Sequence, residues 1–286
     1  MKVHYRLFRI DGLNIDPLGF NWKNRLAFTN SRLPDKHTAT AYVKIPRPFS
    51  DPIYRDGFSE HGKDLQESFR LLSIFFACYG LANNQYLPKI DMTGSSGHEI
   101  EEDQFSLDNL HFWIGIENPS GYGTMSIEQT MQCLNNTVPL FDKVMKILEN
   151  KKDHKLDVAL IMYYRSAITF ESMEAFTDSI TALEALYLEN ANSYKLALRA
   201  SIFTETDYSM RREIFDGLRE AYQKRNDFVH GDDVSLGVIG DYQVSKFIVS
   251  SVLKKSLLNY IELAFIGKKK SDIIKYIEDI ALGLKR

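Results

Sequence analysis

Apolar residues recur at spacings of three and four through almost the whole C-terminal half of this 286-residue chain. Such spacing places them on one face of an α-helix, and these faces are buried only if several helices pack side by side. The segments with this pattern are 156–168, 172–190, 193–203, 211–230, 242–267 and 271–285. The sequence therefore predicts an all-α helical bundle over residues 151–286.

Residues 1–150 follow a different pattern. Alternating apolar and polar residues predict strands at 2–10, 38–45 and 110–117. Helical apolar faces occur at 63–80 and 126–150, and Pro139 is expected to interrupt the second. We therefore expect an α+β protein. A mixed N-terminal domain over 1–150, with a small sheet and covering helices, would precede the bundle.

Composition narrows the class of protein. Apolar residues make up 44% and charged residues 26% of the chain, as in a globular protein with a real core. The two cysteines form no CxxC pair, which disfavours a disulfide framework or a structural zinc site. The chain starts without an apolar leader, and its longest apolar run, 71–82, is about half a membrane span. We expect a cytoplasmic protein without a membrane partner.

The charge balance argues against a protein that coats long stretches of nucleic acid. The net charge is −3, and residues 151–286 carry 20 basic and 20 acidic side chains. Nucleic-acid-coating domains are usually basic, although a small phosphate-binding site needs only a few local cations. The lysines at 254–255 and 268–270 are candidates for contact with a nucleic-acid backbone. A solvated charged helix end is the commoner role of such lysines.

Three histidines outside the bundle are weaker candidates for a site. His98 lies in MTGSSGHEIEED (92–103), which is typical of a solvated acidic loop more than of a divalent-metal site. This segment also lacks the GK[ST] ending of a phosphate-binding loop. His61 and His111 have no partner that the sequence identifies. We therefore expect neither a metal nor a cofactor.

The segment 220–231, EAYQKRNDFVHG, ends in a group of polar residues beside an apolar stripe. Asn226 and His230 are four residues apart, close enough on a helix for a hydrogen bond that orients the imidazole. Arg225 and His230 are five apart and diverge by about 140°, so they converge on one phosphate only if the last turn loosens or tightens. A histidine in a last turn, followed by Gly231, is also the ordinary end of a structural helix.

This segment resembles the Arg-(Asn/Ser/Asp)-x-x-x-His signature of HEPN domains. Upstream, SITALEALYLENANSYKLALRASIF (179–203) is similar to the helices that precede the signature in the Apea-like branch of that family. Those helices carry a glutamate and an arginine. The likeness covers roughly residues 156–265, about two-fifths of the chain.

The resemblance implies a metal-independent endoribonuclease that acts as a two-fold homodimer, often as a toxin in toxin–antitoxin or phage-defence systems. It assigns catalytic roles to Arg225, Asn226 and His230. Glu184 and Arg199 match the charged positions of the earlier helices and are expected to form a structural pair. The implied partners are RNA, a second copy of the chain, and an antitoxin or regulatory protein.

These residue types suit RNA cleavage by the ribose 2′-hydroxyl. His230 can transfer protons near neutral pH, because an ordinary histidine pKa is about 6.5. Arg225 can bind the non-bridging phosphoryl oxygens through two N–H groups. One histidine does not readily act as base and acid in the same step, so a dimer that supplies a second is expected.

Two other hypotheses remain open. The bundle can be a non-catalytic scaffold that dimerises or holds a partner or nucleotide, and it would then cleave no RNA. Alternatively, the N-terminal domain is a ligand sensor, and the bundle acts only once that ligand arrives.

Overall fold

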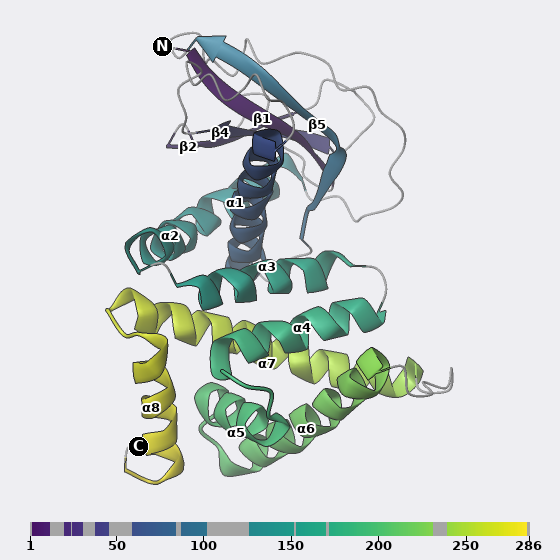
Figure 1. Cartoon of the computed structure of the whole chain (residues 1–286), viewed down its shortest axis with the longest axis vertical. Coiled ribbons are helices and arrows are strands. Elements are labelled where there is room, and N and C mark those ends of the chain that lie inside the picture. The colour runs from purple at the N-terminus through teal and green to yellow at the C-terminus, as the bar shows by residue number, and fades with distance from the viewer. Residues whose placement is uncertain are drawn as a thin grey trace. The chain divides into compact units, whose positions relative to one another are not determined.

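The computed structural model describes residues 2–11, 20–23, 25–30, 38–45, 59–83, 87–101, 126–151, 153–169, 172–230 and 239–284. They form an α+β protein that divides into two compact units, 1–139 and 140–286 (Figure 1). This division and the boundary expected near residue 150 both fall within one helix, α2 (Ile127–Lys151). None of the helices in the described ranges is long and apolar enough to cross a membrane.

The first unit contains an antiparallel sheet with the order β2-β3-β4-β1-β5. Its strands are β1 (Lys2–Asp11), β2 (Phe20–Trp22), β3 (Leu26–Asn30), β4 (Thr38–Ile45) and β5 (Lys89–Glu101). The strands predicted at 2–10 and 38–45 are confirmed, whereas β2 and β3 were not predicted. The strand predicted at 110–117 lies outside the described residues.

Strand β5 corrects the loop expected at 92–103. It pairs with β1 from Lys2 opposite Glu101 to Asp11 opposite Lys89, with a register shift between Leu7 and Arg9. Backbone hydrogen bonds hold this ladder, and they do not depend on side-chain type. The glycines and serines that indicate a loop in sequence are therefore accommodated beside a long partner strand.

Helix α1 (Ser59–Asn83) provides the apolar cover of the sheet. The rings of Phe75 and Phe76 lie 5.2 Å and 5.7 Å from the ring of Phe28 on β3, and all three are fully buried. Tilted aromatic contacts of this kind add to the stabilisation from burial alone. The helix is a few residues longer at both ends than the predicted segment 63–80.

Helix α2 is continuous through Pro139, so the expected interruption is wrong. Proline removes the N–H that would bond the carbonyl four residues earlier. That residue is Asn135, which is exposed, so water can bond its carbonyl in place of the missing donor.

The second unit contains helices and no strand among its described residues, and the predicted helices are confirmed to within a few residues. They are α3 (His154–Ile168), α4 (Ser172–Tyr187), α5 (Ser193–Thr204), α6 (Tyr208–His230), α7 (Ile239–Phe265) and α8 (Lys270–Ala281). Helix α7 contacts all the others in this group. In Figure 1 it passes α4, with α5 and α6 beside each other and α8 turning back from its end.

Two buried polar contacts fix α7 within the bundle. The hydroxyl of Tyr187 on α4 donates a 2.7 Å hydrogen bond to Ser256, and that of Tyr260 donates a 2.9 Å bond to Asp153 ahead of α3. Burial raises the pKa of both tyrosines, so these hydroxyls remain protonated donors. Helix α6 packs against this fixed α7, where a Cβ on Gly217 would meet Ile248 at 3.1 Å.

Candidate functional site

The expected catalytic residues lie on the last two turns of α6, on two sides of the helix. Arg225 lies seven residues after Leu218 and four after Ala221, both fully buried, so helix geometry places it on the buried face. His230 lies about 140° further round, and its side chain is exposed. Because α6 stays α-helical through His230, the loosened last turn that would bring the two groups to one phosphate is not present.

Glu184 on α4 is the partner of Arg225. Arg225 Nη2 lies 3.4 Å from Glu184 Oε2, and the Tyr222 hydroxyl donates a 2.8 Å hydrogen bond to the other carboxylate oxygen. The side chains of Arg225 and Glu184 are only 22% and 20% exposed. Water therefore screens this ion pair less than it screens a pair on the open surface. One carboxylate thus fixes two side chains of α6.

The remaining contacts of Arg225 also lie within the protein. Nη1 donates a 3.1 Å hydrogen bond to Asn226 Oδ1, and the guanidinium carbon lies 5.9 Å from the centre of the Tyr222 ring. Nε is buried and has no hydrogen-bond partner among the described residues. Asn226 was expected to orient His230, but in the part of the chain that the structure describes it bonds to Arg225 and not to the imidazole.

Tyr222 holds this network in one protonation state. The pKa of its hydroxyl is raised to about 12, first by burial and then by the Glu184 carboxylate, which accepts the hydrogen bond of the hydroxyl and would repel the phenolate. The hydroxyl is therefore a donor at every physiological pH. It orients the carboxylate that in turn binds Arg225.

The expected pairing of Glu184 with Arg199 is wrong. Arg199 on α5 donates a 2.5 Å hydrogen bond to the carbonyl of Tyr187 and lies 2.6 Å from Glu278 on α8. Glu184 lies three residues before Tyr187, about 60° round α4, and it meets α6 instead. The family resemblance pointed to both charged positions but not to the helix that each of them faces.

Lys270 has a structural role that accounts for one of the candidate lysines. Its ammonium group donates hydrogen bonds of 2.9 Å and 2.7 Å to the carbonyls of Ala185 and Leu188, at the end of α4. A cation there satisfies carbonyls that have no partner within the helix. Burial lowers the pKa of Lys270. This lysine therefore stabilises α4 and is not placed to contact RNA.

The remaining sequence candidates add little to the site. Gly231, the expected helix exit, and His111 lie outside the described residues, and the surroundings of the His61 and His98 side chains are likewise not described. Among the side chains that are described, no three His, Cys, Asp or Glu residues are grouped so that they could hold a metal ion.

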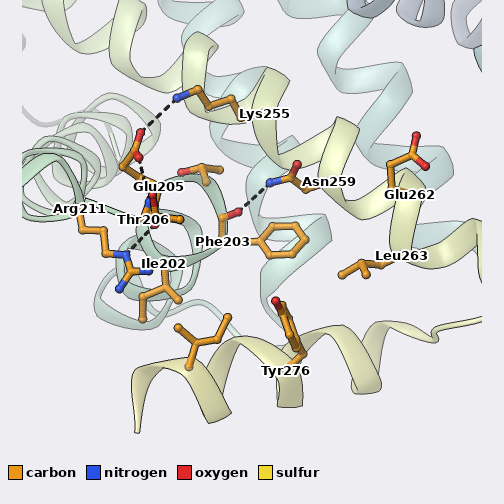
Figure 2. A pocket seen from close by; sticks show the side chains of 12 residues that line it. Ile202, Phe203, Glu205, Thr206, Arg211, Lys255, Asn259, Glu262, Leu263 and Tyr276 are labelled. Atoms are coloured by element: carbon orange, nitrogen blue, oxygen red, sulfur yellow. Dashed lines mark hydrogen bonds and ion pairs between the residues drawn. The ribbon is translucent and has the colours of Figure 1, made fainter. Parts of the chain in front are cut away.

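A cavity of about 600 Å³ lies near the other end of α6 (Figure 2). It forms where the end of α5, the first turns of α6, and α7 and α8 meet. Phe203, Leu263 and Tyr276 provide apolar lining, and Arg211 and Lys255 provide cations. Its lining comes from four helices that are separated in sequence, so no local motif predicted it.

The charged groups of this cavity already have partners, and Glu262 pairs with Lys143 on α2 at 2.6 Å. Lys255 Nζ lies 3.4 Å from the Glu205 carboxylate, and Arg211 Nε donates a 2.6 Å bond to the Glu205 carbonyl. Backbone N–H groups of Thr206 and Asp207 donate to the Glu205 carboxylate and are the main cause of its lowered pKa. Glu205 thus holds both of these cations, Lys255 through its carboxylate and Arg211 through its backbone carbonyl.

Comparison with models of known protein families, with curated proteins and with solved structures found no match to this chain.

Proposed function

We propose that the C-terminal unit is a metal-independent endoribonuclease of the HEPN type. The observation that carries this proposal is the position of His230, which is exposed at the last turn of α6. Arg225, five residues earlier, is anchored to Glu184. The helices predicted before the signature also occur in the expected order.

The proposed reaction is an internal transfer of the phosphoryl group. The ribose 2′-oxygen forms a bond to the adjacent phosphorus, and the bond from phosphorus to the 5′-oxygen of the next nucleotide breaks. A base takes the proton from the 2′-hydroxyl, and an acid gives a proton to the leaving 5′-oxygen. The products are a 2′,3′-cyclic phosphate and a 5′-hydroxyl, and no metal ion is required.

In this reaction His230 transfers protons, and Arg225 stabilises the charge on the phosphoryl oxygens. Glu184 and Asn226 each take one N–H of the guanidinium, and an arginine has five. The second N–H groups of Nη1 and Nη2 have no hydrogen bond among the described residues, and in this proposal they bind the phosphate. Glu184 and Tyr222 act as positioning residues, because they hold the guanidinium at one place on α6.

The proposed enzyme is a homodimer. Arg225 and His230 of one chain point about 140° apart, so a single chain does not surround a phosphate with both groups. Two copies that meet near the ends of their α6 helices would place two imidazoles in one cleft. One imidazole would then act as base and the other as acid.

The decisive test is RNA cleavage in the presence of EDTA. Wild-type protein should produce cyclic-phosphate ends, and His230→Ala should lower the rate by at least 100-fold, in line with the usual contribution of general acid–base catalysis. His154→Ala is the matched control, because His154 is also an exposed histidine at the end of a helix in the same unit. Unchanged cleavage by His230→Ala would remove the histidine from the mechanism.

The biological role that we propose is that of a toxin-like effector in phage defence or in a toxin–antitoxin pair, restrained or triggered through the N-terminal unit or a partner protein. Expression of the wild-type chain should slow cell growth, and expression of His230→Ala should not. Equal growth of the two strains, with equal protein levels, would contradict this role.

One observation favours the second candidate, a non-catalytic scaffold. The Arg225 guanidinium is only partly exposed, and a carboxylate already offsets its charge. A scaffold of this kind would use α6 to dimerise or to hold a partner. It would cleave no RNA in EDTA or with added metal, and wild type and His230→Ala would form the same oligomer.

A further inference from the structure

One side of α6 carries aromatic and basic residues over the first half of the helix, then Asn226, and His230 at the end. Tyr208, Arg212, Phe215, Arg219 and His230 fall within an arc of about 60° when the helix is turned by about 100° per residue. We call this side the α6 outer face. Its residues from 212 to 230 span about 27 Å at about 1.5 Å per residue, which is long enough for several nucleotides.

The aromatic groups of this face are open to solvent. Tyr208 is 80% exposed, and Tyr194, which reaches the face from α5, is 55% exposed. The ring of Tyr194 meets the ring of Phe215 edge-on, with 5.4 Å between the centroids and 81° between the planes. Phe215 therefore holds Tyr194 in place while most of the tyrosine remains accessible.

Two arginines flank the Phe215 ring. The guanidinium carbons of Arg212 and Arg219 each lie 5.9 Å from its centre, within the range of a cation–π contact. Asp216 lies 2.7 Å from Arg212 and offsets much of its charge. Arg219 has no ion-pair partner among the described residues, so it supplies most of the uncompensated positive charge on the face.

We infer that the α6 outer face binds single-stranded RNA and directs it towards His230. This inference rests on the proposed ribonuclease function. Proteins that bind single strands combine cations for the phosphates with aromatic rings on which bases stack. Arg219 supplies such a cation, and Tyr194 and Tyr208 supply exposed rings. Their alignment with His230 gives the strand a direction.

Charge favours RNA over a second copy of the chain at this face. A two-fold dimer that paired the outer faces near Phe215 would bury the uncompensated charge of Arg219 from both copies, and like charges at close range oppose association. Phosphates have the opposite charge and would neutralise Arg219. The face is also a local feature, so it is compatible with a chain whose net charge is −3.

Binding is measured by the fluorescence anisotropy of a labelled 12-nucleotide RNA of mixed sequence. Every protein carries His230→Ala, so that binding is separated from cleavage. Adding Arg219→Glu should weaken binding by at least tenfold. It should also lower the slope of log K against log salt by about 0.7, because one phosphate contact is lost. Adding Tyr208→Ala should weaken binding by about fivefold or more, as expected for one stacked base.

The matched control is Lys275→Glu in the same background, which reverses an exposed charge on α8, a helix that packs against α5 and α7. It should bind RNA within twofold of the background protein. Far-UV circular dichroism and size-exclusion chromatography check that each variant keeps its fold and its oligomeric state. If Arg219→Glu and Tyr208→Ala bind RNA as tightly as the background, the inference is wrong. It is also wrong if Arg219→Glu dissociates an oligomer without weakening RNA binding, since the face would then be a protein interface.

Failure of the face and failure of the ribonuclease proposal are distinguishable. If wild type cleaves RNA but the Arg219 and Tyr208 variants bind normally, the enzyme remains and the RNA path is elsewhere. If these variants lose RNA binding but wild type never cleaves, the face is an RNA-binding surface on a non-catalytic protein.

Discussion

The two ends of α6 hold their arginines in different ways. Near the N-terminal end, Arg211 borders an open cavity and bonds to a backbone carbonyl of the α5–α6 connection. Near the C-terminal end, Arg225 lies on the buried face and is held by the carboxylate of Glu184 from another helix. The first contact fixes a turn, whereas the second joins two helices. One short segment can therefore contain a residue that the fold holds, Arg225, as well as one that is exposed, His230.

The largest expected effect on the free energy of unfolding comes from the side-chain packing near the N-terminal end of α6. Phe203 is 8% exposed and forms an edge-to-face contact with the buried Tyr187. Phe203→Ala should lower the free energy of unfolding by about 3–5 kcal/mol. Phe228→Ala, at the other end of α6, should cost less than half as much because Phe228 is 39% exposed. Urea unfolding measures both changes in free energy. Equal losses for Phe203→Ala and Phe228→Ala would show that the two ends of α6 do not differ in packing.

The second effect sharpens the contrast between the arginines. Arg225→Ala leaves the Glu184 carboxylate partly buried without its cation and should cost about 1–3 kcal/mol of unfolding free energy. Arg211→Ala should lower the free energy of unfolding by less, because water can replace Arg211 as the hydrogen-bond donor to the Glu205 carbonyl. In Glu184→Gln the further change Arg225→Ala should cost less than in wild type, because the two residues interact. Additive losses in urea unfolding would show that the ion pair contributes nothing.

The third effect is a pH dependence of the stabilisation that Tyr222 provides near the C-terminal end of α6. Tyr222→Phe should cost about 1–2 kcal/mol near pH 8, through loss of a hydrogen bond to a carboxylate. An unfolded tyrosine has a pKa of about 10, and that of Tyr222 is raised to about 12. The stabilisation is therefore complete below pH 10 and is lost as the pH rises through about 12. The difference between wild type and Tyr222→Phe should shrink between pH 9 and 11.5 in urea unfolding, whereas Tyr208→Phe should make no difference at either pH.

The smallest effect is expected at the salt bridge beside the cavity. The side chain of Lys255 is 52% exposed and lies 3.4 Å from Glu205, and such pairs contribute little because water and salt screen them. Lys255→Ala should leave the urea midpoint unchanged within error at high and low salt. A clear loss that disappears at high salt would show that this pair stabilises the turn before α6.

Much of the secondary structure was predictable, because helix periodicity in 151–286 is strong and local. The failures also have physical causes. The Gly–Ser sequence of β5 indicates a loop until β1 supplies a backbone partner. Pro139 indicates a helix break, but the carbonyl that it leaves unbonded belongs to an exposed residue.

The candidate site was predictable in position but not in geometry. Sequence spacing located Arg225 and His230 on one helix and gave their divergence. It did not identify Glu184 as the partner of Arg225, because that contact joins residues 41 apart in sequence. It also missed the alignment of Tyr194 with Phe215, which requires α5 and α6 to pack together.

The sequence alone determined that the C-terminal half is built from amphipathic helices and that one of them ends in Arg225, Asn226 and His230. Periodicity and spacing are properties of a single element, so they can be obtained without knowing its neighbours. Only the tertiary structure decided that Arg225 faces Glu184 while His230 faces solvent. That outcome depends on which helices pack against α6, and packing is settled by the burial of all the apolar faces together.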